Sequence, residues 1–239
     1  MQKIMQKKTE LTASDLKWIA LITMIVDHMG VLWLGKGSAL YWICRAIGRL
    51  AFPLYCFLLV EGFVHTRDPK KYLGRLLAFA VISELPYDLV HDRLIFGPTL
   101  GETLSNLLYG QNVLFTLALG LIALMGFVRL QNQNQPTLAV SWCVLISGLA
   151  WLFRTDCSYG GVALICIFYR FRQDPPMRMI WGTGTLLFAL GWLDVTAVLD
   201  FWLVSHYHGA LGSRKGKWWF YVAYPAHLLI LWCVGKWIF

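Results

Sequence analysis

The chain has 239 residues, of which 58% are hydrophobic and only 14% are charged. Soluble domains carry roughly 25% charged residues, and apolar runs of about 17 residues or more, each able to cross the ~30 Å hydrocarbon layer, recur along this chain. The composition argues against a soluble enzyme. It predicts an all-α integral membrane protein that forms one domain over residues 1–239.

The apolar runs predict a polytopic bundle of about nine transmembrane helices with a cytoplasmic N-terminus. They lie at about residues 16–34, 42–64, 73–91, 111–130, 137–153, 158–170, 178–193, 195–207 and 218–236. Most Lys and Arg residues fall in the N-terminal segment and in alternate loops, which is the positive-inside pattern. A single tilted helix over 178–207 is the alternative, but eight spans would bring the C-terminus inside and scramble that pattern.

The net charge of +8 follows from this distribution, so the sequence predicts the lipid bilayer as a partner and no nucleic acid. The six cysteines are scattered and include no C-x-x-C pair. Neither a disulfide framework nor a metal site is therefore predicted.

The first span contains two awkward side chains, Asp27 and His28, in the stretch "ITMIVDHMG". Lys17 precedes His28 by eleven residues, which is about 1,100° of helical rotation, so both lie within about 20° of one face and about 16 Å apart along the axis. An anionic carrier with a long thin arm, such as coenzyme A, could rest its phosphates on Lys17 and reach His28. A lysine that snorkels from a helix end is the alternative.

Later spans also carry polar groups, which are costly in hydrocarbon and by default mark a functional site. The second span holds Arg45 and Arg49 on one face, and the third holds Glu84 and Asp88 around Pro86. Further polar residues are Gln111, Asn112, Asp156, Tyr159 and His227. In the nine-span topology most of this set falls in the outer half of the membrane, which predicts a water-accessible cavity there. Alternatively, such groups pair with each other, for example Arg49 with Glu84, and only hold the bundle together.

Six blocks resemble, in order, those of the TraX family, which is named for the conjugation protein that N-acetylates the first residue of F-type pilin. They are "LKWIALITMIVDHMG", "RAIGRLAFPLYCFLLVEGFVHT", "KYLGRLLAFAVISELPYDL", "QNVLFTLALGLIAL", "YGGVALICIFY" and "FYVAYPAHLLIL". The family is distantly similar to transmembrane acyltransferases, among them the acyltransferase 3 proteins and the lysosomal heparan-glucosaminide N-acetyltransferase. Their first-span signature is a basic residue, ten intervening residues and a histidine, which Lys17 and His28 match. "YHG" at 207–209 departs from the expected Tyr-Asn-Gly.

The resemblance implies a multi-pass protein of the bacterial cytoplasmic (inner) membrane. It would take acetyl-CoA from the cytoplasm and acetylate an amine or hydroxyl of an extracytoplasmic acceptor, either a protein N-terminus such as that of pilin or a cell-envelope glycan. His28 would be the general base, with a covalent acetyl-imidazole as a variant. Asp27 or another carboxylate would set the His28 tautomer, or Asp27 would pair with Arg45 or Arg49, which could also stabilise the tetrahedral oxyanion.

Three groups of residues follow from this hypothesis. We expect a catalytic group of Asp27, His28, Arg45, Arg49, Glu84, Asp88 and His227. The expected coenzyme A ligands are Lys17, Lys71, Arg75, Lys215 and Lys217, and the expected acceptor contacts are Gln111, Asn112, Asp156 and Tyr159. The alternatives are a proton-coupled transporter that uses the buried His, Asp and Glu as a relay, and a structural subunit of a secretion or pilus machine.

Overall fold

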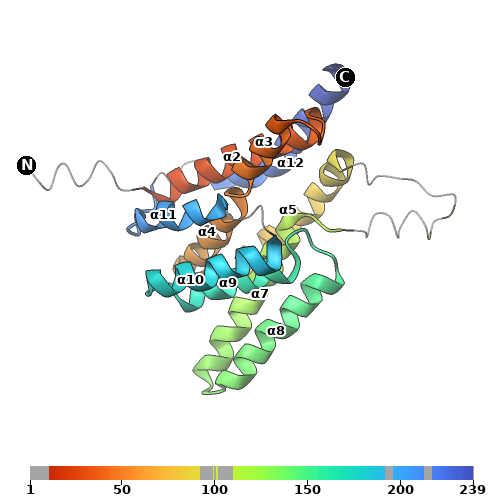
Figure 1. Cartoon of the computed structure of the whole chain (residues 1–239). Coiled ribbons are helices and arrows are strands. Elements are labelled where there is room, and N and C mark those ends of the chain that lie inside the picture. The colour runs from red at the N-terminus through yellow and green to blue at the C-terminus, as the bar shows by residue number, and fades with distance from the viewer. Residues whose placement is uncertain are drawn as a thin grey trace, which may run out of the picture.

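A computed structural model describes residues 11–91, 99, 101, 110–191, 196–212 and 217–238, without the side chains of 190, 217 and 238. Helices make up most of these residues (Figure 1). The only β-type pairing in this described part of the chain is an isolated parallel bridge between Leu11 and Tyr207. The prediction of an all-α fold is confirmed for the residues that are described.

The helices follow the predicted apolar runs closely. They are α2 (Ala13–Trp33), α3 (Ala39–Gly48), α4 (Ala51–His65), α5 (Pro69–Val90), α7 (Val113–Asn132), α8 (Pro136–Leu152), α9 (Ser158–Arg170), α10 (Pro175–Thr185), the π-helix η1 (Leu186–Leu190), α11 (Leu199–Ser205) and α12 (Lys217–Ile238).

Local signals in the sequence set where helices begin. The Thr12 hydroxyl accepts from the backbone N–H of Asp15, whose carboxylate accepts from the Thr12 N–H at 2.9 Å, so a capping box starts α2. Asp68 and Asp174 cap α5 and α10, and a proline follows each at the first helical position. In α5 and α10 the capping aspartate and the proline after it together fix the residue at which the helix begins.

The second predicted span is not one continuous helix. It divides into α3 and α4, with a turn at Arg49 and Leu50. Pro53 has no N–H, so the carbonyl of Arg49 loses its usual partner four residues ahead, and the helix breaks there. The break places Arg49 at a bend rather than on a straight helical face.

Four helical segments are long and apolar enough to cross a membrane. They are Ala13–Trp33, Ala39–His65, Val113–Asn132 and Trp218–Trp237. The 13 residues of α9 rise only about 20 Å, less than the ~30 Å hydrocarbon core. The described residues thus form a helical fold with four candidate membrane spans, by length and composition, and the count of nine is not confirmed.

Packing brings helices that are distant in sequence around one common core. α2 contacts α3, α4 and α12, α4 contacts α9, and α5 contacts α7 and α12. A second, smaller apolar cluster joins α7 to α8 and α9 around Ala123, Ile146 and Val162. In Figure 1, α7 and α8 form a hairpin at the lower edge of the bundle, away from α2. α2, α4, α5 and α12 enclose the candidate site described below.

Candidate functional site

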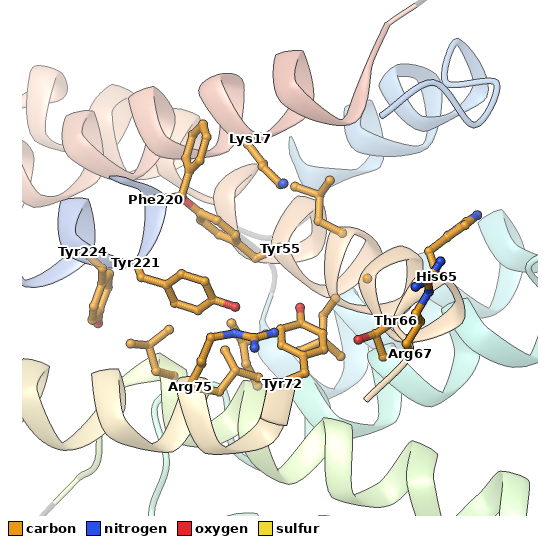
Figure 2. A pocket seen from close by; sticks show the side chains of 16 residues that line it. Lys17, Tyr55, His65, Thr66, Arg67, Tyr72, Arg75, Phe220, Tyr221 and Tyr224 are labelled. Carbon is orange, nitrogen blue, oxygen red and sulfur yellow. The ribbon is translucent and has the colours of Figure 1, made fainter. Parts of the chain in front are cut away.

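A cavity of about 700 Å³ lies among α2, α4, α5 and α12, with part of α7 as its floor. Its lining combines the cationic Lys17, Arg67 and Arg75 with His65 and a set of aromatic rings. The rings are those of Tyr55, Tyr72, Phe220, Tyr221 and Tyr224. Figure 2 shows His65, Thr66 and Arg67 at one end of this cavity and Tyr224 at the other. We refer to it as the larger cavity.

Cations and rings alternate on the walls of the larger cavity. The Lys17 ammonium lies 5.6 Å from the centre of the Phe220 ring, and the Arg75 guanidinium lies 5.6 Å from that of Tyr72. Figure 2 shows Arg75 between Tyr72 and Tyr221, and Lys17 reaches the cavity from α2. Such walls suit a ligand with both anionic groups and a flat ring system, because the cations pair with charge and the aromatic faces stack.

Not all the lysines predicted to bind coenzyme A lie here. Lys71 does not line the larger cavity. It extends into solvent with its side chain 81% exposed and pairs with Asp68 at 3.4 Å. The backbone N–H of Lys71 lowers the pKa of the Asp68 carboxyl, as expected for a helix cap. Lys215 and the side chain of Lys217 fall outside the described residues.

A second cavity of about 190 Å³ surrounds His28. We call it the smaller cavity. Its lining comes from six parts of the chain: α2, the α3–α4 region, the end of α5, the start of α7, the segment before α9, and α12. Five of the predicted site residues line it, namely Asp27, His28, Arg45, Arg49 and Asp156. Residues up to 200 positions apart in the chain, from Met24 to Tyr224, thus line one small space.

Asp27 and Arg45 form an ion pair across α2 and α3. Their side chains approach to 2.5 Å and are largely shielded from solvent. Gly48 allows this close packing, because a Cβ at that position would collide with the carboxylate of Asp27. Of the two roles open to Asp27, the structure shows pairing with Arg45.

The tautomers of His28 and His227 follow from their hydrogen bonds. His28 Nδ1 lies 2.9 Å from the carbonyl oxygen of Met24, and His227 Nδ1 lies 2.8 Å from that of Ala223. Because a carbonyl only accepts, both rings carry their proton on Nδ1. His28 Nδ1–H is also 3.2 Å from Nε2 of His227, which has the lone pair to accept it. A backbone carbonyl and an imidazole, rather than a carboxylate, therefore orient His28.

A third histidine, His91, was not among the predicted site residues. It lines the smaller cavity, with its ring centre 6.3 Å from that of His28, and its Nδ1 bonds the Tyr87 carbonyl at 2.9 Å. The helical period contained a signal for it, since His91 follows Glu84 by seven residues and falls on the same face. It was missed because it stands at the very end of the apolar run.

Apart from the lysines above, six predicted residues line neither cavity: Glu84, Asp88, Gln111, Asn112, Tyr159 and His227. The side chain of Asn112 donates to Glu84 and to the carbonyl of Ala80 (2.8 Å), and its oxygen caps α7 by accepting from Leu114 N–H at 3.0 Å. Glu84 and Asn112 thus join α5 to α7. Asp88 is buried, and Tyr159 is exposed. Backbone bonds tie Gln111 to Arg154 and Asp156.

The "YHG" segment lies at the start of α2 instead of at either cavity. Leu11 N–H donates to the His206 carbonyl at 3.0 Å, and Ala13 N–H donates to that of Ala210 at 2.8 Å. The Tyr207 hydroxyl donates to Glu61 at 3.0 Å, while His208 is exposed. Through these backbone hydrogen bonds the segment holds the N-terminal end of α2, the helix that carries Lys17 and His28. Within the described residues no group of three or more His, Cys, Asp and Glu is placed to hold a metal ion.

Comparison with known proteins gives the family. The family model described as "TraX protein" matches residues 12–235. A protein of Dichelobacter nodosus named "Probable fimbrial assembly protein FimC, serogroup H1" is 36% identical over 253 residues, covering 97% of this chain and 98% of the relative. No solved structure matches the chain. With a match of this length to the family and a relative aligned nearly end to end, the chain belongs to the TraX family.

Proposed function

We propose that this protein is a membrane-embedded acetyltransferase. It takes the acetyl group of acetyl-CoA from the cytoplasm and transfers it to an amine or hydroxyl of an acceptor on the other side of the cytoplasmic (inner) membrane. The observation that carries the proposal is that one helix, α2, supplies both a cation to the larger cavity (Lys17) and the central histidine of the smaller one (His28). Their separation of about 16 Å along the axis suits an extended arm that runs from one to the other.

The larger cavity would hold the nucleotide end of coenzyme A. Lys17, Arg67 and Arg75 offer positive charge to its phosphates, and the aromatic walls offer stacking surface to adenine. The volume of about 700 Å³ lies within the range of roughly 300–1,000 Å³ that is usual for small-molecule sites. The positive-inside pattern supports a cytoplasmic opening, since Lys17 and Arg67 lie at the ends of α2 and α4 that it assigns to that side.

His28 would be the general base in the smaller cavity. Its Nδ1–H is held by Met24 and His227, so Nε2 carries the lone pair and takes the proton from the acceptor's N–H or O–H. The acceptor atom bonds to the thioester carbonyl carbon, the carbon–sulfur bond breaks, and coenzyme A leaves as a thiolate that takes up a proton. Arg49 lines the same cavity and would stabilise the oxyanion of the tetrahedral intermediate.

The family supports a pilus-related acceptor. The curated relative is named as a fimbrial assembly protein, and the TraX family is linked to pilin acetylation. We therefore favour the N-terminal amine of a pilin-type protein as the acceptor over a cell-envelope glycan. An amine must lose a proton to react, which is the step that a neutral imidazole performs.

Binding of acetyl-CoA to the purified full-length protein tests this function. Titration calorimetry in detergent should show a single site with micromolar affinity, which is the usual range for cosubstrates. The transporter alternative has support in the contact between His28 and His227, because adjacent imidazoles also suit a proton relay. A protein that does not bind acetyl-CoA but acidifies proteoliposomes along a proton gradient would favour that alternative. A structural subunit would do neither.

A further inference from the structure

Two tyrosines stand where the two cavities meet. Tyr55 on α4 and Tyr224 on α12 line both the larger and the smaller cavity, and among the described residues no other side chain lines both. Tyr224 is only 5% exposed, and its ring lies 5.7 Å from that of His227. In Figure 2 both rings lie toward the end of the larger cavity that is remote from Arg67. Any arm that passes from Lys17 to His28 must therefore pass these rings.

The smaller cavity limits what can be accommodated beyond the two tyrosines. Its volume is about 190 Å³, compared with about 700 Å³ for the larger cavity. This space must hold the acyl group and the reacting end of the acceptor together. Each methylene added to the acyl chain takes up more of this limited space and brings the chain closer to walls that are packed like a protein interior.

We propose that Tyr55 and Tyr224 determine the acyl-chain specificity of the enzyme and keep water from the thioester. This inference rests on the proposed function. The two rings fill the space between the cavities, admit the narrow thioester arm, and leave no room for an acyl chain longer than acetyl. In the part of the chain that is described, neither hydroxyl makes a hydrogen bond to another residue, so the two rings are held mainly by packing.

Replacing either ring by alanine would join the two cavities. A four-carbon acyl group would then fit, and water would reach the carbonyl carbon. In that hydrolysis the oxygen of water bonds to the carbonyl carbon, the carbon–sulfur bond breaks, and the proton from water passes to the sulfur. The products are a carboxylic acid and the free thiol of coenzyme A, so the release of thiol reports the reaction without any added acceptor.

The test uses purified full-length protein in lipid nanodiscs, with acetyl-CoA or butyryl-CoA and a thiol reagent. The variants are Tyr55→Ala, Tyr224→Ala and Tyr224→Phe, together with Tyr72→Ala, which truncates a ring that lines only the larger cavity. Each rate is divided by the fraction of protein that binds coenzyme A, so that loss of folded protein does not affect the result.

We expect both tyrosine-to-alanine variants to release thiol from butyryl-CoA at least about tenfold faster than wild type, since a misfit methylene in a pocket is worth roughly 10–200-fold. Tyr224→Phe keeps the ring and should release thiol from butyryl-CoA far more slowly than Tyr224→Ala, whereas Tyr72→Ala should weaken coenzyme A binding without the rise in thiol release. Alanine variants that bind coenzyme A but release thiol no faster than wild type overturn the inference. Failure of wild type to bind coenzyme A instead removes the proposed function itself.

Discussion

His28 donates from Nδ1 to Nε2 of His227 at 3.2 Å, although 199 positions separate the two residues in the chain. Helices α2 and α12 meet at this contact, so the first and last described helices together build the reacting centre. Each imidazole is held by the carbonyl four residues before it in its own helix. The backbone therefore fixes the tautomer of both rings, and the predictions below follow from that arrangement.

Removing the His28 imidazole should abolish acetyl transfer while the protein stays folded. Loss of a general base costs roughly 10²–10⁴ in rate. The measurement is the incorporation of labelled acetyl groups by purified His28→Ala. His206→Ala is the matched control, because His206 also bonds the carbonyl four residues before it, at 2.8 Å, but lines neither cavity. Wild-type turnover in His28→Ala contradicts the assignment.

His227 should act as a positioning residue for His28. Replacing it by leucine removes one of the two acceptors of His28 Nδ1–H and leaves only the Met24 carbonyl. A hydrogen bond to a charged group is worth about 1.5–3 kcal/mol, so kcat should fall roughly 10–100-fold. The KM for acetyl-CoA should not change. His227→Gln offers an amide oxygen in place of Nε2 and should recover part of the rate. Equal rates for the leucine and glutamine variants would refute the role of this hydrogen bond.

Lys17 and Lys71 should differ in their effect on acetyl-CoA affinity. Lys17 lines the larger cavity, so Lys17→Ala should raise the Kd about tenfold or more, which is the worth of one charge-assisted contact. Lys71 is exposed and pairs with Asp68, so Lys71→Ala should leave the Kd within about twofold, as exposed pairs contribute little. Calorimetry on both variants decides. An unaffected Kd in Lys17→Ala would remove that residue from the donor site.

Gly48→Ala should destabilise the protein and reduce its activity together. The added Cβ would collide with the Asp27 carboxylate and disturb its pair with Arg45. Overpacking of this kind costs about 1–3 kcal/mol. Gly148→Ala on α8 is the control, because nothing lies within 4 Å of the new Cβ and alanine favours the helix by up to about 1 kcal/mol. The two variants should shift the Tm in opposite directions. A Tm for Gly48→Ala at or above that of Gly148→Ala would be inconsistent with this packing.

Donor and acceptor should approach from opposite sides of the membrane. Sealed inside-out vesicles that receive radiolabelled acetyl-CoA on the outside should accumulate labelled product in the lumen. That product should resist protease added outside and become sensitive after detergent is added. Vesicles carrying His28→Ala supply the background. Labelled product that is fully sensitive to protease before detergent would place both substrates on one side.

The sequence predicted local geometry better than contacts between helices. Lys17 and His28 share one helix, so a count of eleven residues was enough to place both on one face, and each lines a cavity. A signal for the break between α3 and α4, Pro53, was visible in "RLAFPLYC". The predicted continuous span passed over it, because the apolar run does not stop at the proline.

The wall of the site was harder to predict. Tyr55, Tyr72 and Tyr224 lie in apolar runs, where an aromatic ring also suits the core or the membrane interface, so only the packing of α4, α5 and α12 reveals their role. Glu84 and Asn112 show the opposite case. As polar residues in or beside apolar runs, they were predicted to be functional. Asn112 immediately precedes an apolar run, however, which is the sequence signal of a helix cap.

The prolines divide the site into a fixed part and a compliant part. Lys17 and His28 belong to α2, which is a continuous helix without proline, so the distance between them is fixed. Tyr55 follows Pro53, which lies just after the break between α3 and α4, by two residues. Tyr224 directly precedes Pro225, where α12 lacks a backbone hydrogen bond. We therefore expect α4 and α12 to bend slightly when the arm of coenzyme A passes Tyr55 and Tyr224, while α2 stays straight. Pro53→Ala or Pro225→Ala should stiffen these helices and slow turnover without changing the distance between Lys17 and His28.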